Sequence, residues 1–264
     1  MIGLLFLLVD QTVVLAGVEA PWAGLVVTLF LGLTMLSVVE LLAGSSERGG
    51  TYVLIHEIFA GLPSFLTGWS ILAASLALAA ALARVAVDQI LLFFPEDLFS
   101  STFITMTLIG VLVTIQLIQI MPRRVQLWAV TFPLLFALIA VLLSTVPDVN
   151  RGAFTDPARF QLRSLNQAVA WLSSSYLVFE ALLSSRRLIH SSTRNLPNAI
   201  LRTGILMGAL LIASLLLAIG LRLTPYAEST SFINSLGSAS FLSGWLINLI
   251  AIAAMILAAN GAIT

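Results

Sequence analysis

Apolar stretches long enough to cross a lipid bilayer recur throughout this sequence, and they constrain its fold more than any other feature. A hydrocarbon core about 30 Å thick needs about 20 apolar residues in a helix that rises about 1.5 Å per residue. One short stretch covers about 2–17, and seven full-length stretches cover about 22–43, 62–92, 101–121, 125–146, 165–190, 197–221 and 239–260. Lipid offers the backbone no hydrogen bonds, so such stretches are stable there as helices. We therefore expect an all-α membrane protein with a single transmembrane domain over residues 1–264.

The composition supports a lipid environment and narrows the possible functions. Hydrophobic residues make up 59% of the chain and charged residues 9%, whereas a typical soluble domain has about 25% charged residues. Twelve basic residues balance twelve acidic ones, which leaves no basic surface for nucleic acid. The chain has no Cys, and His56 and His190 lie in separate segments, so we expect no metal site and no cofactor. It also lacks a Ser-His-Asp grouping and a phosphate-binding loop, and we do not expect an enzyme.

Prolines and arginines indicate where the helices end and which way they face. Most prolines fall at predicted helix ends, where a missing backbone N–H costs least, whereas Pro133 falls inside the 125–146 span. Arginines gather in alternate loops, at 48, 123–124 and 186–194, which places those loops in the cytoplasm of a multi-pass protein of the cell (inner) membrane. The segment 49–60 is too short to cross and has apolar residues at helical spacing, so it predicts a helix in the cytoplasmic interface.

Two spaced motifs resemble a known family. The first runs from Glu40 through Arg48-Gly49-Gly50-Thr51-Tyr52 to Gly68-Trp69. The second is Phe179-Glu180, followed fourteen residues later by Arg194-Asn195-Leu196-Pro197-Asn198-Ala199-Ile200. In residue types and intervening lengths, both resemble the amino acid–polyamine–organocation (APC) superfamily of permeases. In that superfamily an acidic residue closes the second helix, a Gly-Gly-x-Tyr turn and an interfacial helix follow, and Gly-Trp opens the third helix. Its sixth helix carries Gly-Phe-Glu, and Arg-Asn-Ile-Pro-x-Ala-Ile leads into the seventh.

The resemblance implies a LeuT-like fold, in which ten core helices form two inverted repeats of five. It covers essentially the whole chain, from part of the first helix to the eighth. We therefore expect an incomplete LeuT-like inverted-repeat helical bundle, with about seven full transmembrane helices plus one partial helix, truncated at both ends.

The resemblance also implies where a substrate would bind. In this fold two broken helices expose backbone N–H and C=O groups near the midplane of the membrane. Gly3 is nearest to the small residues of the first break, and Ser173, Ser174, Ser175 and Tyr176 stand at the expected second break. Consecutive serines can compete for backbone hydrogen bonds and loosen a helix, or they can pack closely against a neighbouring helix. These five residues form the predicted substrate site.

Four ionisable residues inside the predicted spans are expected to have gating or structural roles. Glu180 would cost about 2.5–3.5 kcal/mol if it faced lipid, so it must face protein or water. Arg84 and Asp88 are spaced i, i+4 and can neutralise each other as an ion pair near the outer interface. Asp10, in the first half-helix, is positioned to meet a cationic substrate.

Two functions remain open at this point. The first is a secondary active transporter (permease) that moves an amino acid or a related amine by alternating access in the bilayer, coupled to protons or to sodium. The coupling ion is not readable, because the chain has no Lys where some proton-coupled relatives carry one in the fifth helix. The second is a non-transporting or decayed membrane scaffold of the same fold, which the leucines after Gly3 and the presence of Val178 in place of a Gly favour.

Overall fold

The regular structure of the chain is helical. The computed structural model describes residues 2–44, 51–59, 61–93, 100–118, 132–149, 162–175, 192–222, 232–233, 236 and 244–263. All regular elements in these ranges are helices, as the sequence predicts: α1 (Ile2–Ala16), α2 (Ala20–Gly44), α3 (Thr51–Phe59), α4 (Gly61–Leu91), α5 (Ser101–Ile118), α7 (Phe132–Thr145), α8 (Leu162–Leu172), α10 (Ser192–Arg222) and α12 (Gly244–Ile263). Short 3-10 turns occupy Gly17–Glu19, Val146–Asp148 and Ser173–Ser175.

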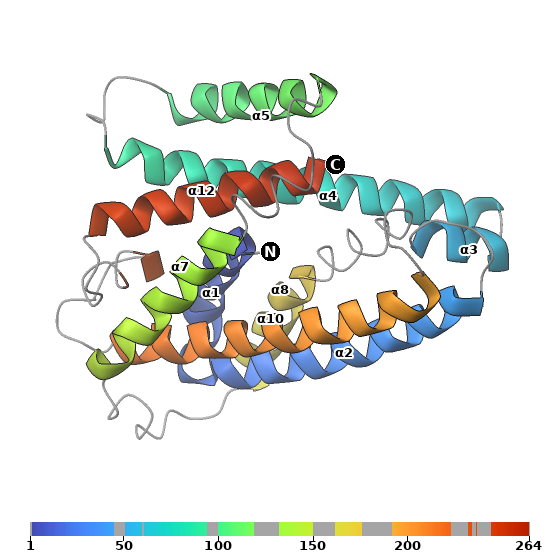
Figure 1. Cartoon of the computed structure of the whole chain (residues 1–264), viewed down its shortest axis with the longest axis horizontal. Helices are drawn as coiled ribbons and strands as arrows, with labels where there is room; N and C mark the ends of the chain where they lie inside the picture. The colour runs from blue at the N-terminus through green and yellow to red at the C-terminus, as the bar shows by residue number, and fades with distance from the viewer. Residues whose placement is uncertain are drawn as a thin grey trace.

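The helices are arranged in layers around α1. α4 and α12 run antiparallel side by side, with α5 on their outer side, and α2 and α10 form a second antiparallel pair on the opposite side (Figure 1). α1, α7 and α8 lie between the two pairs, and α1 contacts α8, α10 and α12 (Figure 1). Leu8 and Val9 of α1 are almost completely buried. The first helix is therefore the centre of the apolar core.

Two glycines in left-handed conformation separate consecutive helices. A single helix over the apolar run Gly3–Leu41 would have 39 residues and would be about 58 Å long, far more than a bilayer requires. Gly17 has a φ of 53° and opens the 3-10 turn between α1 and α2, so that the chain changes direction there. Gly61, with a φ of 55°, separates the short helix α3 from α4. Residues with a Cβ atom rarely adopt this conformation, which explains why glycine stands at both turns.

The short helix α3 lies against the first turns of α4, through a hydrogen bond from His56 and through the ring of Tyr52. His56 Nδ1 lies 3.1 Å from the hydroxyl of Ser64, and the rings of Tyr52 and His56 stack with centroids 6.1 Å apart. A Cβ on Gly68 would stand 3.1 Å from the Tyr52 ring, so the ring rests directly on the α4 backbone. Tyr52 and Gly68, both part of the first motif, thus meet in space.

The observed bounds of two helices differ from the predicted spans. α10 begins at Ser192 rather than at 197, so Pro197 lies inside the helix. Pro197 has no N–H to donate to the Thr193 carbonyl, which is its acceptor in the α-helical pattern. Pro133, predicted to lie inside a span, is the second residue of α7 as described, while 119–131 lie outside the described ranges. A proline is tolerated at the second position of α7, because the first turn of a helix has no intrahelical acceptors for its N–H groups.

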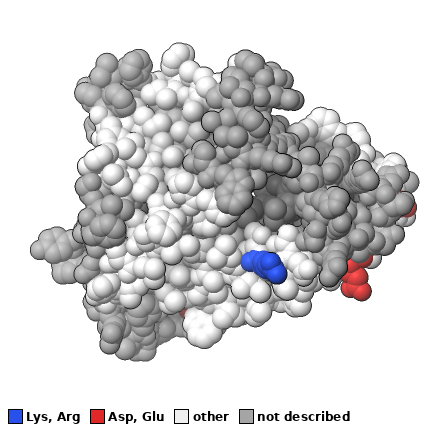
Figure 2. Space-filling view, in the orientation of Figure 1, with Lys and Arg blue, Asp and Glu red and all other residues white. Residues whose placement is uncertain are grey.

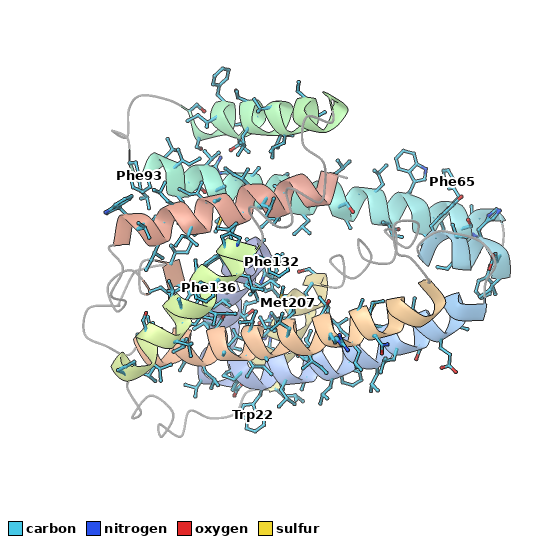
Figure 3. All side chains as sticks on the ribbon, viewed as in Figure 1. Trp22, Phe65, Phe93, Phe132, Phe136 and Met207 are labelled. Atoms are coloured by element: carbon cyan, nitrogen blue, oxygen red, sulfur yellow. The ribbon has the colours of Figure 1, made fainter. Side chains whose placement is uncertain are left out.

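Length and composition indicate a multi-pass membrane protein. Among the described residues, three helical runs are long and apolar enough to cross a bilayer: Gly3–Leu41, Gly61–Leu91 and Asn198–Leu221. Large apolar side chains also cover the outer surface, since Trp22 is 62% exposed, Phe65 is 58% exposed, and both point away from the bundle (Figure 3). Charged side chains of the described residues form only isolated spots on the face drawn in Figure 2. An apolar surface of this kind would promote aggregation in water, whereas it is compatible with contact to lipid.

Close backbone contacts through small residues hold the helices together. A Cβ on Gly3 would stand 2.6 Å from Met255 Cα and would also meet the carbonyl oxygen of Ala254, so α1 and α12 touch at their backbones. A Cβ on Gly208 would collide with the Thr28 side chain, so that side chain of α2 rests on the α10 backbone. Small residues serve this purpose in membranes, where lipid tails are as apolar as leucine and association depends on packing.

Replacing Gly3 by Val is expected to push α1 away from α12. Overpacking of this kind costs about 1–3 kcal/mol, and we expect a lower Tm for the purified protein in detergent. Gly110→Val on α5 is the matched control, because a Cβ there has nothing within 4 Å. If the two variants lowered the Tm equally, the close contact between α1 and α12 would be wrong.

Candidate functional site

A pocket lies between α1, α2, α10 and the 3-10 turn Ser173–Ser175. Its volume is about 310 Å³. α1 contributes Leu4, Leu5 and Leu8 to the wall, α2 contributes residues between 27 and 36, and α10 contributes residues between 200 and 211. Ser175 lines it from the serine turn. Met207 points from α10 into the interior toward α1, as Figure 3 shows.

The described walls of this pocket are almost entirely apolar. Thr28 and Ser175 are the polar residues among them, and none of the described lining residues is charged. The Thr28 hydroxyl donates a hydrogen bond to the Gly24 carbonyl oxygen at 2.7 Å, within its own helix. Ser175 is half-buried. The pocket therefore favours hydrocarbon along its length and offers a hydroxyl from the serine turn.

Glycines shape two walls of the pocket. Gly32 faces it from α2, and Gly204 and Gly208 face it from α10. A Cβ added at Gly32 would meet no atom within 4 Å, whereas one added at Gly208 would collide with Thr28. Gly32 therefore borders empty space, and Gly208 sets the distance between the two helices.

The serine stretch marks a change of helix type. α8 ends at Leu172, and Ser173–Ser175 continue as a 3-10 turn. The Ser173 hydroxyl donates to the Val169 carbonyl oxygen at 2.8 Å, one turn back, and its side chain is exposed. Ser174 is half-buried, and Ser175 reaches the pocket. Tyr176 and Glu180 lie outside the described residues, so their predicted roles stay predictions.

Gly3 does not line the pocket in the described structure. It packs on the α12 backbone, as described above, while the next two residues, Leu4 and Leu5, turn into the pocket. These two leucines were not among the residues predicted to bind substrate. A role of Gly3 in substrate binding stays a prediction.

Asp10 binds a backbone amide. Its Oδ1 accepts a hydrogen bond of 2.7 Å from the N–H of Phe232, a residue that lies just before α12 and is 2% exposed. The rings of Phe232 and Phe6 also lie close, with centroids 6.5 Å apart. Asp10 therefore anchors the segment before α12 to α1. Contact with a cationic substrate stays a prediction for this residue.

Arg84 and Asp88 form the ion pair that their spacing predicts. Arg84 Nε lies 3.2 Å from Asp88 Oδ1, and each side chain is 47% exposed. The pair is spaced i, i+4 on α4, and neither residue lines the pocket. In the described structure, the two side chains neutralise each other's charge on the surface of α4.

Several residues that join helices or line the pocket were not predicted from the sequence. Ser164 of α8 donates a hydrogen bond of 2.9 Å to Oε2 of Glu19, which is 8% exposed, and this contact joins the turn after α1 to α8. Thr28 and Gly32 line the pocket without having been predicted. The four-residue spacing of Gly24, Thr28 and Gly32, and of Gly204 and Gly208, is a small-residue pattern that would have drawn attention to these two helix faces. Within the described ranges, no three His, Asp or Glu side chains gather closely enough to hold a metal ion.

Comparison of the chain with protein-family models and with curated protein sequences gives no match.

Removal of the Asp10 carboxylate is expected to loosen the segment before α12. Asp10→Ala leaves the buried Phe232 N–H without this acceptor, and a hydrogen bond to a charged group contributes about 1.5–3 kcal/mol. We expect faster hydrogen exchange of residues 232–236 and a lower Tm. Asp10→Asn keeps an oxygen acceptor and should show a smaller change. Equal effects of the two substitutions would contradict the assignment.

The Arg84–Asp88 pair is expected to contribute little to stability. Because both side chains are half exposed, a double-mutant cycle with Arg84→Ala and Asp88→Ala should give a coupling free energy of about 0.2–1 kcal/mol. Chemical unfolding of the four proteins measures it. A coupling above about 2 kcal/mol would place the pair in a desolvated environment and contradict the exposed geometry.

Proposed function

We propose that this chain is a secondary active transporter that moves an amino acid or a related amine across the membrane by alternating access. The observation that carries the proposal is that one pocket is lined both by Ser175, which belongs to the predicted site, and by the start of α1 next to Gly3. Leu4 and Leu5, directly after Gly3, form one side, and Ser175 of the serine turn forms another. A pocket between helices of a bundle is a common place for a small-molecule site.

The change of helix type at Ser173 also supports transport. A 3-10 turn uses i→i+3 hydrogen bonds in place of the α pattern, and such turns are frequent at the ends of α-helices. Backbone groups that leave the α pattern beside a cavity can bind the polar groups of a ligand. In the described structure this turn reaches the pocket through Ser175.

The pairing of the helices gives the proposal a second, independent support. In the predicted order of spans, the first, second and third helices are α1, α2 and α4, and the sixth, seventh and eighth are α8, α10 and α12. α1 contacts α8, α2 contacts α10, and α4 contacts α12. Two inverted repeats related by a two-fold axis bring equivalent helices together near that axis and make them antiparallel. The antiparallel pairs in Figure 1 agree with such an arrangement.

A membrane scaffold that does not transport is the second candidate. The observation that favours it is the close packing of Gly3 on α12, which leaves the backbone of the first predicted break covered rather than open to a ligand. The apolar lining of the pocket also favours a scaffold, because the described walls hold no charged group that could bind a zwitterion.

Uptake by proteoliposomes separates the two candidates. The full chain, reconstituted in liposomes, is offered radiolabelled amino acids and amines of different side-chain chemistry under an imposed proton or sodium gradient. We expect accumulation of at least one compound above that in protein-free liposomes, and loss of this accumulation when an ionophore collapses the coupling gradient. No accumulation of any compound, with folded protein present, would contradict transport and leave the scaffold.

A further inference from the structure

We infer that an ordered water molecule binds between α4 and α12, where it bridges the side-chain amides of Gln89 and Asn248 and joins the two helices. Two buried amide oxygens without a hydrogen-bond partner carry the inference. It goes beyond the proposed function and does not depend on it, because the same water would join these helices in a transporter and in a scaffold.

The two amide oxygens are buried acceptors that need a donor. Gln89 Oε1 and Asn248 Oδ1 are both shielded from solvent, and neither accepts a hydrogen bond from the described residues. The Gln89 residue as a whole is only 9% exposed. Burial of an amide oxygen without a donor is costly, so an orphan atom of this kind in a native protein indicates a bound water or ion.

The two amides lie at the same end of an antiparallel helix pair. Gln89 is in the last turn of α4, which ends at Leu91. Asn248 is in the second turn of α12, which begins at Gly244. Because α4 and α12 run antiparallel and in contact, these two ends meet, on the side where Figure 3 labels Phe93 (Figure 1).

Helical periodicity turns both amides toward the contact between the helices. Leu82 of α4 and Ala259 of α12 belong to one buried cluster. Gln89 follows Leu82 by two turns, and Asn248 precedes Ala259 by three turns, so each amide shares a helix face with its cluster member. In an antiparallel pair both shifts run in the same direction. They differ by about 6 Å at 1.5 Å per residue, a distance that a glutamine side chain and one water molecule can span.

α5 adds a third polar side chain to this layer. Thr105 precedes Leu112, the α5 member of the same cluster, by two turns, and it is 9% exposed. Its hydroxyl donates to the Ser101 carbonyl oxygen at 2.8 Å, within its own helix. The Thr105 hydrogen is therefore already used. Thr105 makes the layer polar but supplies no donor for the two amide oxygens.

A neutral donor suits this layer better than a cation. The described acid nearest in the chain is Asp88, which is half exposed and paired with Arg84 at 3.2 Å, and a buried cation without a counter-charge is strongly unfavourable. The layer also lies in the first turns of α5 and α12, where the helix dipoles disfavour a positive charge. A water molecule carries no charge and can donate one hydrogen bond to each oxygen, and buried waters in proteins have two to four such polar partners.

An experimental density map of the full chain, at a resolution that shows ordered waters, tests the inference without any substitution. We expect a peak at hydrogen-bond distance, about 2.7–3.2 Å, from both Gln89 Oε1 and Asn248 Oδ1. A direct hydrogen bond between the two amides, or an apolar contact with no peak between them, would overturn the inference.

Paired substitutions test the bridge in solution. Gln89→Met and Asn248→Leu keep the side-chain size and remove the amide, so each alone leaves the other oxygen and the water with a lost partner. We expect each single variant in detergent to have a lower Tm, and the double variant to regain at least half of the summed loss, because removal of both polar partners is far less costly than removal of one. Gln11→Met, at an exposed amide of α1, is the matched control and should add to Asn248→Leu without any recovery. Fully additive losses for Gln89→Met and Asn248→Leu would contradict a shared bridge.

Salt exchange separates water from a cation. At constant ionic strength, the Tm of the unmodified chain should be the same in sodium, potassium and choline chloride if a neutral water fills the layer. A Tm that rises in sodium or potassium chloride, and no longer rises in Gln89→Met, would assign the layer to a cation and overturn the inference.

Discussion

Close contact between helix backbones is the interaction on which the rest of this structure depends. Between helices in lipid there is little hydrophobic driving force, so association relies on packing that only small residues allow. Gly3 lets α1 reach the backbone of α12 at Ala254 and Met255, and Gly208 lets α10 reach Thr28 of α2. The first contact joins α1 to one antiparallel helix pair, and the second holds the other pair together. The layered arrangement follows from where the glycines stand.

The same packing creates the pocket. Thr28 touches Gly208 and also lines the cavity, so the wall between α2 and α10 is part of a tightly packed pair. The other described walls come from α1 and from the 3-10 turn after α8. Alternating access requires one set of helices to move against another.

The helical character of the chain could be predicted from the sequence, because hydropathy over about 20 residues is a local property. The Arg84–Asp88 pair could be predicted as well, since an i, i+4 spacing on one helix determines it. The partner of Asp10 could not, because Phe232 is far away in the chain and the contact exists only once α1 and the segment before α12 have come together. Gly3 was assigned to a helix break, yet it packs on α12, whose approach no local pattern reveals. The apolar pocket walls at Thr28 and Gly32 were missed for the same reason.

Site-specific labelling tests most directly the central claim, that these helices cross a membrane. The chain has no Cys, so a single introduced cysteine reports on one position. Glu57 on α3 and Ser100 before α5 are both exposed, and the 31-residue helix α4 separates them. In cells and in inverted vesicles, a membrane-impermeant maleimide should label Glu57→Cys only from the cytoplasmic side and Ser100→Cys only from the opposite side. Labelling of both positions from the same side would contradict the account.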